Sequence, residues 1–472
     1  MRRLIILLLS LVASCAMMSA KVVLPSLVGD NMVLQQNANV RIWGWSIPAN
    51  KIDVSASWTS ETFSCKSDKS GYWEVIVPTP RADHQAHVMM INDGDPLAIY
   101  NILLGEVWVA GGQSNMKFPI GGIWHSYVPG NNEIIAHATD YPEIRMFTVV
   151  EETALDPQDK CKGEWQVPTP ENLISWSAVA YSFAKNINTV LHVPVGIINS
   201  SWGGTIIEAW MAKEDLKEFK DVDYTPIRDD SKPVFTKPYM MYNAMIKPLT
   251  KYVIRGFIFY QGCSNVWKAD TYAEKMQKMV SRWRSDWGLG QLPFYYVEIA
   301  PFNYGHDNVQ GALLRESQFK AQKLIPNSGM VSIYDLCEGE EPANAHPINK
   351  MPVGERLSYY ALNQVYGIKA ICCSYPSFKS MEIVGREAHL SFEYGDCPDL
   401  YPWNNLKGFE ISGEDGVWHP AFAYLNLATR KIVVWSEYLD HPKNVRYCFK
   451  NINYGNVINT RGLPLVPFRT DK

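Results

Sequence analysis

The stretch Gly105–Met116, which reads GEVWVAGGQSNM, decides the fold that we expect for this chain. Within it, Val107–Ala110 is a short apolar run typical of a buried strand, and the pair Gly111–Gly112 breaks this run before Ser114. A serine on a glycine turn at the end of a buried strand is well placed for a nucleophile, because its hydroxyl is exposed at the rim of the sheet. A plain glycine-serine loop is an equally good interpretation of this segment alone.

Apolar strand-like runs alternate with helical patterns between residues 102 and 369. Val195–Asn199 and Val253–Tyr260 are strand candidates, whereas Val179–Leu191 and Tyr272–Trp287 carry apolar residues on one helical face. Strands that alternate with helices predict a parallel sheet with both faces covered by helices. In such sheets the active site lies beyond the carboxyl ends of the strands.

Residues 21–101 and 370–472 show a different pattern, of short alternating segments separated by turn residues. Examples are Tyr72–Val77 in the first region and Phe409–Ser412 in the second. Each region therefore predicts a β-sandwich domain. The expected fold class is α/β, with a central domain at 102–369 flanked by an N-terminal and a C-terminal β-sandwich.

The composition is that of a globular protein with more than one domain. The chain has 472 residues, of which 47% are hydrophobic and 12% aromatic, and one core rarely grows beyond roughly 250–300 residues. The net charge of −4 argues against a nucleic-acid or anionic-membrane partner, because such binding needs a concentrated basic surface. No motif predicts an oligomeric state.

The first 20 residues have the pattern of a secretory signal peptide. Arg2–Arg3 precede the apolar segment Leu4–Ala13, which is too short to span a bilayer. Ser19–Ala20 would serve an ordinary signal peptidase, and we favour ordinary export to the periplasm or the extracellular space. The alternative is a lipoprotein with a lipid anchor on Cys15, since the residues up to Cys15 resemble a lipobox.

The nine cysteines are scattered along the chain, with no CxxC pair and no Cys/His cluster at zinc spacing. The sequence therefore predicts neither a metal site nor a cofactor. Disulfides are compatible with export, but the sequence does not give their connectivity.

Polar residues and glycines follow the predicted strands, where the carboxyl ends should meet. Ser114 follows the first strand, Gly203–Gly204 the second, and Gln261 and Asn265 the third, whereas His346 lies in the last loop. Imidazole takes a proton near neutral pH, so His346 is the natural general base for a serine nucleophile. Taken singly, a loop histidine is more often an ordinary surface residue, and an asparagine after a strand is more often part of a turn.

Longer motifs surround these residues and occur in a fixed order. Together they resemble the sialate O-acetylesterase family of SGNH-type hydrolases. The motifs are GQSNM at Gly112–Met116, SSWGGTIIEAW at Ser200–Trp210, FYQGCSN at Phe259–Asn265 and HPINKMPVGERL at His346–Leu357, with DNMVLQ, YNAMIKPL, VRYCF and GLPLVPFRT outside this core. The resemblance covers essentially the whole chain after the signal.

The resemblance implies an SGNH-hydrolase-like fold and an esterase that removes O-acetyl groups from sugars without a metal ion. Carried over by position, Ser114 would be the nucleophile and His346 its base. The amide of Ser114, the Gly203–Gly204 turn and the side chain of Asn265 would form the oxyanion hole. Gln113, Gln261 and Cys263 would lie next to the site.

Two positions depart from the family pattern. Cys263 stands where the family usually has Glu in a QGESN motif, and Ala343 stands where related hydrolases often have Asp three residues before the histidine. The acid that would orient His346 is therefore unassigned. Asp335 is one candidate, and the alternatives are a backbone carbonyl or one of Glu338, Glu340 and Glu341.

Three alternatives remain open at the level of the sequence. The first keeps the chemistry but changes the substrate to acetylated xylan or another glycan. The second is a catalytically weak glycan-binding protein, which Cys263 and Ala343 favour. The third is an exported scaffold, in which Ser114, Asn265 and His346 would lie far apart.

Overall fold

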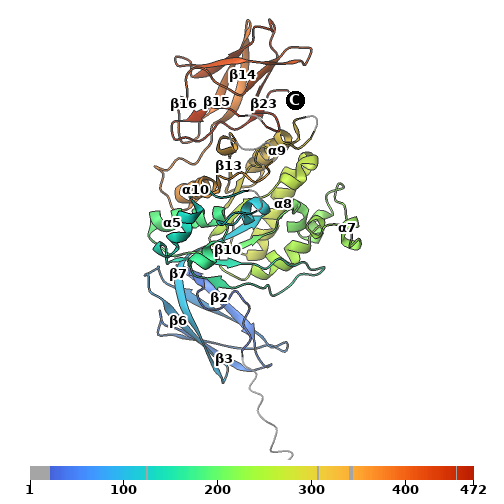
Figure 1. Cartoon of the computed structure of the whole chain (residues 1–472). Helices are drawn as coiled ribbons and strands as arrows, with labels where there is room; N and C mark the ends of the chain where they lie inside the picture. Colours follow the sequence, from blue (N-terminus) through green and yellow to red (C-terminus); the bar gives the residue numbers. More distant parts are fainter. Residues whose placement is uncertain are drawn as a thin grey trace, which may run out of the picture.

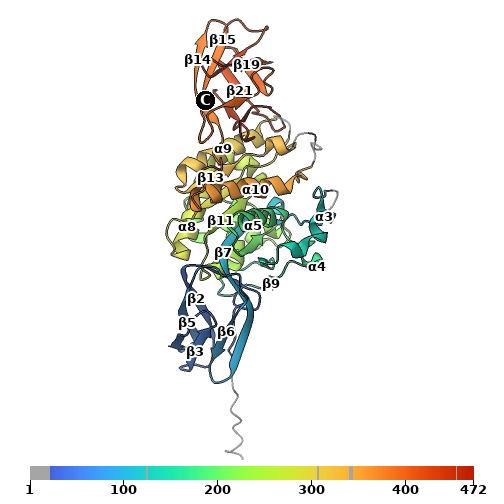
Figure 2. The ribbon, with the colours of Figure 1, turned by 90° about the vertical axis from the view of Figure 1, so that its left-hand side faces the viewer.

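The computed structural model describes residues 22–123, 126–305, 308–337, 339, 344–452 and 454–471. The molecule is elongated, with an N-terminal β-domain, a central α/β domain and a C-terminal β-domain stacked along its long axis (Figures 1 and 2). The predicted signal peptide, including Cys15, lies outside the described residues. No helix within the described ranges is long and apolar enough to cross a membrane.

A mostly parallel sheet forms the centre of the molecule, as predicted. Every pair of neighbouring strands from β13 to β8 runs parallel, and β9 adds an antiparallel edge. The order across the sheet is β13 (Ser328–Val331), β12 (Phe294–Val297), β11 (Gly256–Tyr260), β7 (Pro96–Gly112), β10 (Val195–Ser201), β8 (Ile144–Thr148) and β9 (Trp165–Gln166).

Helices cover both faces of this sheet (Figure 1). One face carries α5 (Ala178–Leu191) and α10 (Lys350–Tyr360), and the other carries α8 (Ala269–Trp287) and α9 (Gln310–Leu324). Side chains alternate along a strand and so pack on opposite faces. Trp108 contacts Phe183 of α5 with ring centroids 5.1 Å apart, and Phe257 contacts Trp287 of α8 at the same centroid distance. These contacts confirm the predicted α/β class.

Strand β7 is much longer than the predicted run Val107–Ala110. It spans 17 residues, pairs with β6 (His87–Asn92) in the N-terminal domain, and continues into the central sheet between β10 and β11. The expected boundary between 101 and 102 therefore falls inside one strand. The apolar run Val107–Ala110 is separated from Leu97–Tyr100 by Asn101, Gly105 and Glu106, so the sequence alone does not show that one strand spans them.

The N-terminal domain is built from two small sheets. Strand β2 pairs with β5, whereas β3 pairs with β4 and β6, and β1 runs parallel to β7. Trp43 and Trp73 belong to the same continuous hydrophobic core as Trp108. The remaining strands are β1 (Val33–Gln35), β2 (Ala38–Trp45), β3 (Lys51–Ala56), β4 (Thr62–Lys66) and β5 (Tyr72–Thr79).

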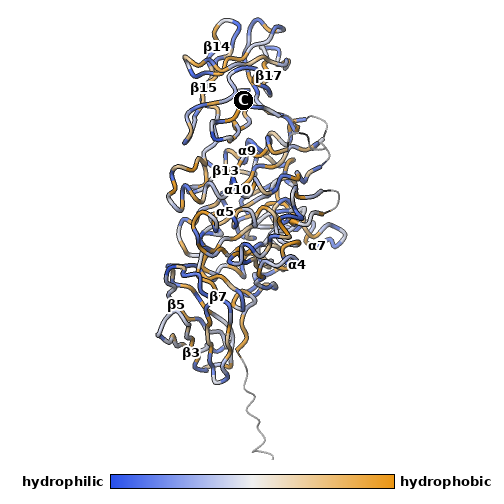
Figure 3. The backbone as a smooth tube through the Cα atoms, turned by 60° about the vertical axis from the view of Figure 1, so that its left-hand side comes forward, coloured by the Kyte–Doolittle hydropathy of each residue, from blue (hydrophilic) through white to orange (hydrophobic). Residues whose placement is uncertain are grey.

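The C-terminal domain has a core of its own between two four-stranded antiparallel sheets. Figure 3 shows hydrophobic and hydrophilic stretches alternating along the chain in both end domains. The strands are β14 (Ser377–Val384), β15 (Glu387–Glu393), β20 (Lys431–Trp435) and β19 (Phe422–Asn426) in one sheet, β18 (Trp418–Pro420), β17 (Phe409–Ser412), β21 (Asn444–Tyr447) and β23 (Phe468–Arg469) in the other, and the pair β16 (Leu400–Tyr401) and β22 (Ile458–Asn459).

Short helices complete the fold and carry several loop residues of interest. They are α2 (Ser114–Lys117), α3 (Asn131–Ala136), α4 (Pro170–Leu173), α6 (Lys213–Leu216) and α7 (Thr225–Arg228), together with η1 (Ala138–Asp140), η2 (Ile207–Trp210), η3 (Val234–Thr236), η4 (Tyr242–Ile246), η5 (Lys247–Leu249), η6 (Cys263–Lys268), η7 (Tyr334–Cys337) and η8 (Ala361–Val365). No disulfide joins any two of the cysteines within the described residues.

Gly112, the last residue of β7, is a position where the backbone itself requires glycine. Its φ is +131°, and a Cβ placed there would lie 2.2 Å from the carbonyl oxygen of Tyr260 in the neighbouring strand. We expect Gly112→Ala to lower the free energy of unfolding by roughly 2–5 kcal/mol, through backbone strain and the collision together. Chemical denaturation followed by tryptophan fluorescence measures this change.

Gly94→Ala is the matched control for that variant. Gly94 has a φ of +114°, but a Cβ there meets nothing within 4 Å. It should therefore cost only the strain of the backbone, about 1–2 kcal/mol. Equal losses in the two variants would show that the close approach to Tyr260 does not limit the packing.

Candidate active site

The carboxyl ends of the central strands surround a cavity of about 450 Å³. Ser114 follows β7 at the start of α2, and two loop residues separate Cys263 from the end of β11. His346 reaches the same cavity from the loop before α10. The described lining residues are Gln113, Ser114, Cys263, Ser264, Val266, Trp267, Phe302, Asn303, Tyr304, Ala345 and His346.

Ser114 and His346 form a hydrogen-bonded pair, although 231 residues separate them along the chain. The distance from Ser114 Oγ to His346 Nε2 is 2.8 Å. The histidine loop is tied to the serine turn by Asn115, whose Nδ2 donates to the carbonyl oxygen of Ala345 at 2.9 Å. The aromatic ring of Phe118 lies beside the imidazole, with centroids 6.1 Å apart. The structure thus brings together the two residues predicted as nucleophile and base.

The surroundings of His346 keep its imidazole neutral. Burial and, second, the positive charge of Lys350 lower the pKa of His346 to about 4. Lys350 is itself buried, and its Nζ donates to the carbonyl oxygen of Pro347 in the same loop. At neutral pH the unprotonated Nε2 can therefore accept the hydroxyl proton of Ser114.

The glycine turn after β10 lies next to Ser114, as the resemblance implied. A Cβ placed on Gly203 would lie 3.5 Å from the Cβ of Ser114. Gly204 is held by the Ser264 hydroxyl, which donates to its carbonyl oxygen at 2.8 Å. Ser114 is the first residue of α2, so its amide N–H has no carbonyl partner within that helix. Backbone amides are thus available close to the serine.

Asn265 is buried directly behind this turn. Its Oδ1 accepts hydrogen bonds from the amide of Ile207 and from Nε2 of Gln261, both at 2.9 Å. Its Nδ2 donates one hydrogen to Glu208 at 2.8 Å. An amide NH2 group has two hydrogens, so this contact leaves one unused, although Asn265 is not among the residues that line the cavity. The role of Asn265 in an oxyanion hole stays a prediction.

The sequence reasoning missed the buried ion pair between Glu208 and Lys275. The carboxylate of Glu208 lies 2.7 Å from Lys275 Nζ, and both side chains are 1% exposed. Lys275 also contacts Asp221 at 2.5 Å. Glu208 falls inside the quoted motif SSWGGTIIEAW, which was the available signal, whereas nothing in α8 singled out Lys275. The pair fixes the carboxylate that orients Asn265.

Gln113 and Gln261 connect the strand ends to one another. Gln113 Oε1 accepts the amide N–H of Gly262 at 2.8 Å, which joins the ends of β7 and β11. Gln261 Nε2 donates to the carbonyl oxygen of Thr205 at 2.9 Å, and its Oε1 accepts the Tyr272 hydroxyl at 2.8 Å. Both glutamines are buried and hold the loops that surround the serine.

Cys263 lines the cavity beside the serine, in the position where the family usually has Glu. Burial raises the pKa of the Cys263 thiol, and the hydroxyl of Tyr304 lies next to it. The thiol is therefore protonated at neutral pH, and a protonated thiol is a weak nucleophile. This environment does not favour Cys263 as an alternative to Ser114.

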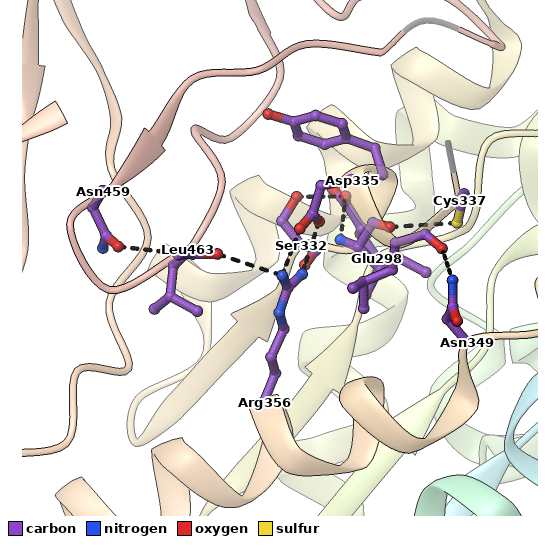
Figure 4. A network of polar contacts seen from close by, with 12 residues as sticks. Glu298, Ser332, Asp335, Cys337, Asn349, Arg356, Asn459 and Leu463 are labelled. Carbon is purple, nitrogen blue, oxygen red and sulfur yellow. Dashed lines mark hydrogen bonds and ion pairs between the residues drawn. The ribbon is translucent and has the colours of Figure 1, made fainter. Parts of the chain in front are cut away.

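Asp335 is engaged by Arg356 rather than by His346 (Figure 4). The guanidinium of Arg356 lies 2.8 Å from Oδ1 and 2.5 Å from Oδ2 of Asp335, and it also donates to the carbonyl oxygen of Ser332 at 2.8 Å. The structure does not bring Asp335 to the imidazole, because α10 supplies a cation that binds both of its oxygens. Glu338, Glu340, Glu341 and Ala343 lie outside the described residues.

No group of three or more His, Cys, Asp or Glu side chains in the described part of the chain could hold a metal ion. The site contains a serine hydroxyl that is hydrogen-bonded to a neutral histidine at the carboxyl edge of a parallel sheet. Together with the covering helices, this arrangement defines the class of the protein as a hydrolase with an SGNH-like α/β fold.

The family described as "Carbohydrate esterase, sialic acid-specific acetylesterase" matches residues 104–359, which is more than half of the chain. The chain belongs to this family. The match covers the central sheet from the middle of β7 to the last turn of α10, and it confirms the predicted class of enzyme.

Solved and curated relatives agree with this assignment. The crystal structure of a carbohydrate acetylesterase from Xanthomonas citri is similar with a TM-score of 0.85 and 34% identity, covering 96% of this chain and 100% of that chain. The sialate O-acetylesterase of Mus musculus is 26% identical over 445 residues, covering 82% of this chain and 81% of the relative. That of Homo sapiens is 27% identical over 419 residues, covering 82% and 79%.

The lowered pKa of His346 predicts how activity depends on pH. The sequence predicts His346 as the base, and a base must be neutral, so kcat/KM should stay constant at higher pH and fall as the pH drops through about 4. Removing the neighbouring charge with Lys350→Met should move this acid limb upward. The shift should stop short of 6.5, because burial is the larger cause of the lowered pKa and remains in the variant. Acetate release measured from pH 3 to 8 tests both expectations.

Lys117→Met is the matched control for the charge of Lys350. Lys117 lies in α2 close to Ser114 in sequence, but its side chain is half exposed and paired with Glu151 at 2.6 Å. Its removal should leave the acid limb in place, because solvent and the partner screen its charge. An unshifted limb in Lys350→Met would contradict the proposed effect of the buried charge.

Proposed function

We propose that this chain hydrolyses O-acetyl esters of sugars at Ser114, with His346 as the general base. The observation that carries the proposal is the hydrogen bond of 2.8 Å between Ser114 Oγ and His346 Nε2, inside a cavity at the strand ends. The assignment to a carbohydrate esterase family supports the reaction type. The role of each residue follows from its position.

In the first half of the reaction, Ser114 Oγ attacks the acetyl carbonyl carbon while His346 Nε2 takes the hydroxyl proton. The imidazolium then returns this proton to the sugar oxygen as the ester bond breaks, which leaves an acetyl group on Ser114. In the second half, His346 takes a proton from water, and the hydroxide attacks the acetyl-enzyme. As the resulting tetrahedral intermediate collapses, the imidazolium gives its proton to Ser114 Oγ, which restores the serine hydroxyl and releases acetic acid.

The negative charge on the carbonyl oxygen needs hydrogen-bond donors in both halves. We assign this function to the amide of Ser114, the Gly203–Gly204 turn and the remaining N–H of Asn265. The contact between Gly203 and Ser114 and the fixed orientation of Asn265 by Glu208 support the assignment. Loss of one such donor typically costs about a hundredfold to a thousandfold in rate.

We propose an O-acetylated sialic acid as the first substrate to test, because two curated relatives are named sialate O-acetylesterases. Acetylated xylan is the alternative, and the similar Xanthomonas citri structure is described as a carbohydrate acetylesterase. We further propose export to the periplasm or the extracellular space, based on Arg2–Arg3 and the apolar segment after them. Mass spectrometry of the mature N-terminus separates ordinary cleavage from a lipid on Cys15.

Acetate release from acetylated sialosides and acetylated xylo-oligosaccharides tests the proposed reaction. We expect Ser114→Ala to lose more than about a thousandfold in kcat, because the acetyl-enzyme cannot form. Ser380→Ala is the matched control, since it removes an exposed serine hydroxyl from β14, outside the cavity. It should stay within about tenfold of the parent, since no covalent step depends on it.

The same experiment tests the alternative of a catalytically weak glycan-binding protein. Cys263 is the observation that favours this alternative, because the family usually has Glu at that position of the cavity. A parent that releases no acetate, together with a Cys263→Glu variant that does, would show that the site has lost activity. Equal rates for the parent and Ser114→Ala would contradict the serine mechanism.

A further inference from the structure

Trp267 is unusually exposed for a tryptophan, and it stands at the mouth of the active-site cavity. Its side chain is 67% exposed, whereas its neighbour Val266 is 5% exposed and belongs to the core. It lines the same cavity as Ser114 and His346. Exposing a large aromatic ring to water costs hydrophobic free energy. A solvent-exposed tryptophan beside a catalytic serine therefore indicates a binding surface.

The structure holds Trp267 in a defined position although its indole ring is exposed to solvent. It lies in η6, and the next residue, Lys268, anchors this segment by donating from Nζ to the carbonyl oxygen of Asp221 at 2.8 Å. A Cβ placed on Gly305 would lie 3.2 Å from Cη2 of the indole. One edge of the ring therefore rests against the backbone of the loop after β12.

The loop that supports the indole also supplies the other aromatic residues of the cavity. Phe302 and Tyr304 both line the cavity, and their rings meet edge to face with centroids 4.9 Å apart. Asn303 and Ser264 are exposed polar residues of the same lining. The mouth of the cavity thus combines aromatic surface with hydrogen-bonding groups, which are the two components that bind a sugar ring.

The C-terminal domain holds this loop in place. Asn451, which follows β21, accepts the amide N–H of Phe302 through its carbonyl oxygen at 3.2 Å and donates its own amide to the carbonyl oxygen of Asn308 at 2.7 Å. Its side-chain Oδ1 accepts the amide of Gly311 at 2.8 Å. Three hydrogen bonds from one buried residue therefore fix both ends of the loop.

From these contacts we propose that Trp267 is the platform on which the pyranose ring of the acetylated sugar stacks. When the acetyl carbonyl lies at Ser114, the sugar must extend towards the mouth of the cavity, where the face of the indole is exposed. The axial C–H groups of a pyranose pack on an aromatic face, and Asn303 and Ser264 then bind ring hydroxyls. This inference rests on the proposed esterase function and names the part of the substrate that the site recognises.

Binding to a variant that cannot turn over tests the platform without the chemistry. Titration calorimetry compares Ser114→Ala with Ser114→Ala/Trp267→Ala, using an O-acetylated xylo-oligosaccharide and an O-acetylated sialoside as the two probes. We expect Trp267→Ala to weaken binding of the preferred probe about tenfold and Trp267→Phe to restore most of the affinity, because a flat ring is retained. The arm with the lower Kd identifies the sugar.

Kinetics in the Ser114 parent provide the second readout. Ethyl acetate carries the acetyl group without a sugar ring, so Trp267→Ala should reduce kcat/KM for the sugar ester at least about fivefold more than for ethyl acetate. Trp403→Ala is the matched control, because Trp403 is also an exposed tryptophan, at 55%, but lies in the C-terminal domain. It should leave both substrates unaffected.

Several outcomes would overturn the platform. Unchanged affinity in Trp267→Ala, no binding of either probe to Ser114→Ala, or equal losses for sugar ester and ethyl acetate would each show that Trp267 does not stack on a sugar. Failure of the esterase proposal has a different signature. In that case the probes bind and depend on Trp267, but the parent releases no more acetate than Ser114→Ala.

Discussion

The pairing of β7 with β10 and β11 is the interaction on which the rest of the site depends. Its register places Gly112 opposite Ser201 on one side and Tyr260 on the other. All three strands therefore end at one level, and the loops that follow them must share the same space. Gly112 permits this approach because a side chain there would collide with the carbonyl oxygen of Tyr260.

Buried charge is the second constraint, and the protein meets it with specific pairs. The buried carboxylate of Glu208 is paired with Lys275, and the half-buried carboxylate of Asp335 is paired with Arg356. A buried charge without a partner is costly, so each pair fixes the segments that carry it. His346 differs from these paired charges, because burial and the positive charge of Lys350 lower its pKa and keep its imidazole uncharged. The result is a polar site that contains a neutral imidazole.

The C-terminal domain contributes to the central domain at several points rather than standing apart from it. Asn451 bonds the loop that carries Phe302 and Tyr304, and the hydroxyl groups of Tyr334 and Tyr447 are 2.9 Å apart across the boundary. Figure 4 shows Arg356 beside Asp335 on one side and the segment of Asn459 and Leu463, from the C-terminal domain, on the other. These contacts give the C-terminal domain a direct influence on the shape of the cavity.

The sequence alone determined the elements whose burial is periodic, such as α5 and β17, because apolar spacing along the chain records which face is buried. Ordered motifs around Ser114 and His346 determined the candidate pair, which the fold brings to 2.8 Å. Only the tertiary structure decided the length of β7, the partner of Asp335 and the pairing of Glu208 with Lys275. These features depend on contacts between strands and charged residues that are far apart in the sequence. The local spacing of residues does not indicate such contacts.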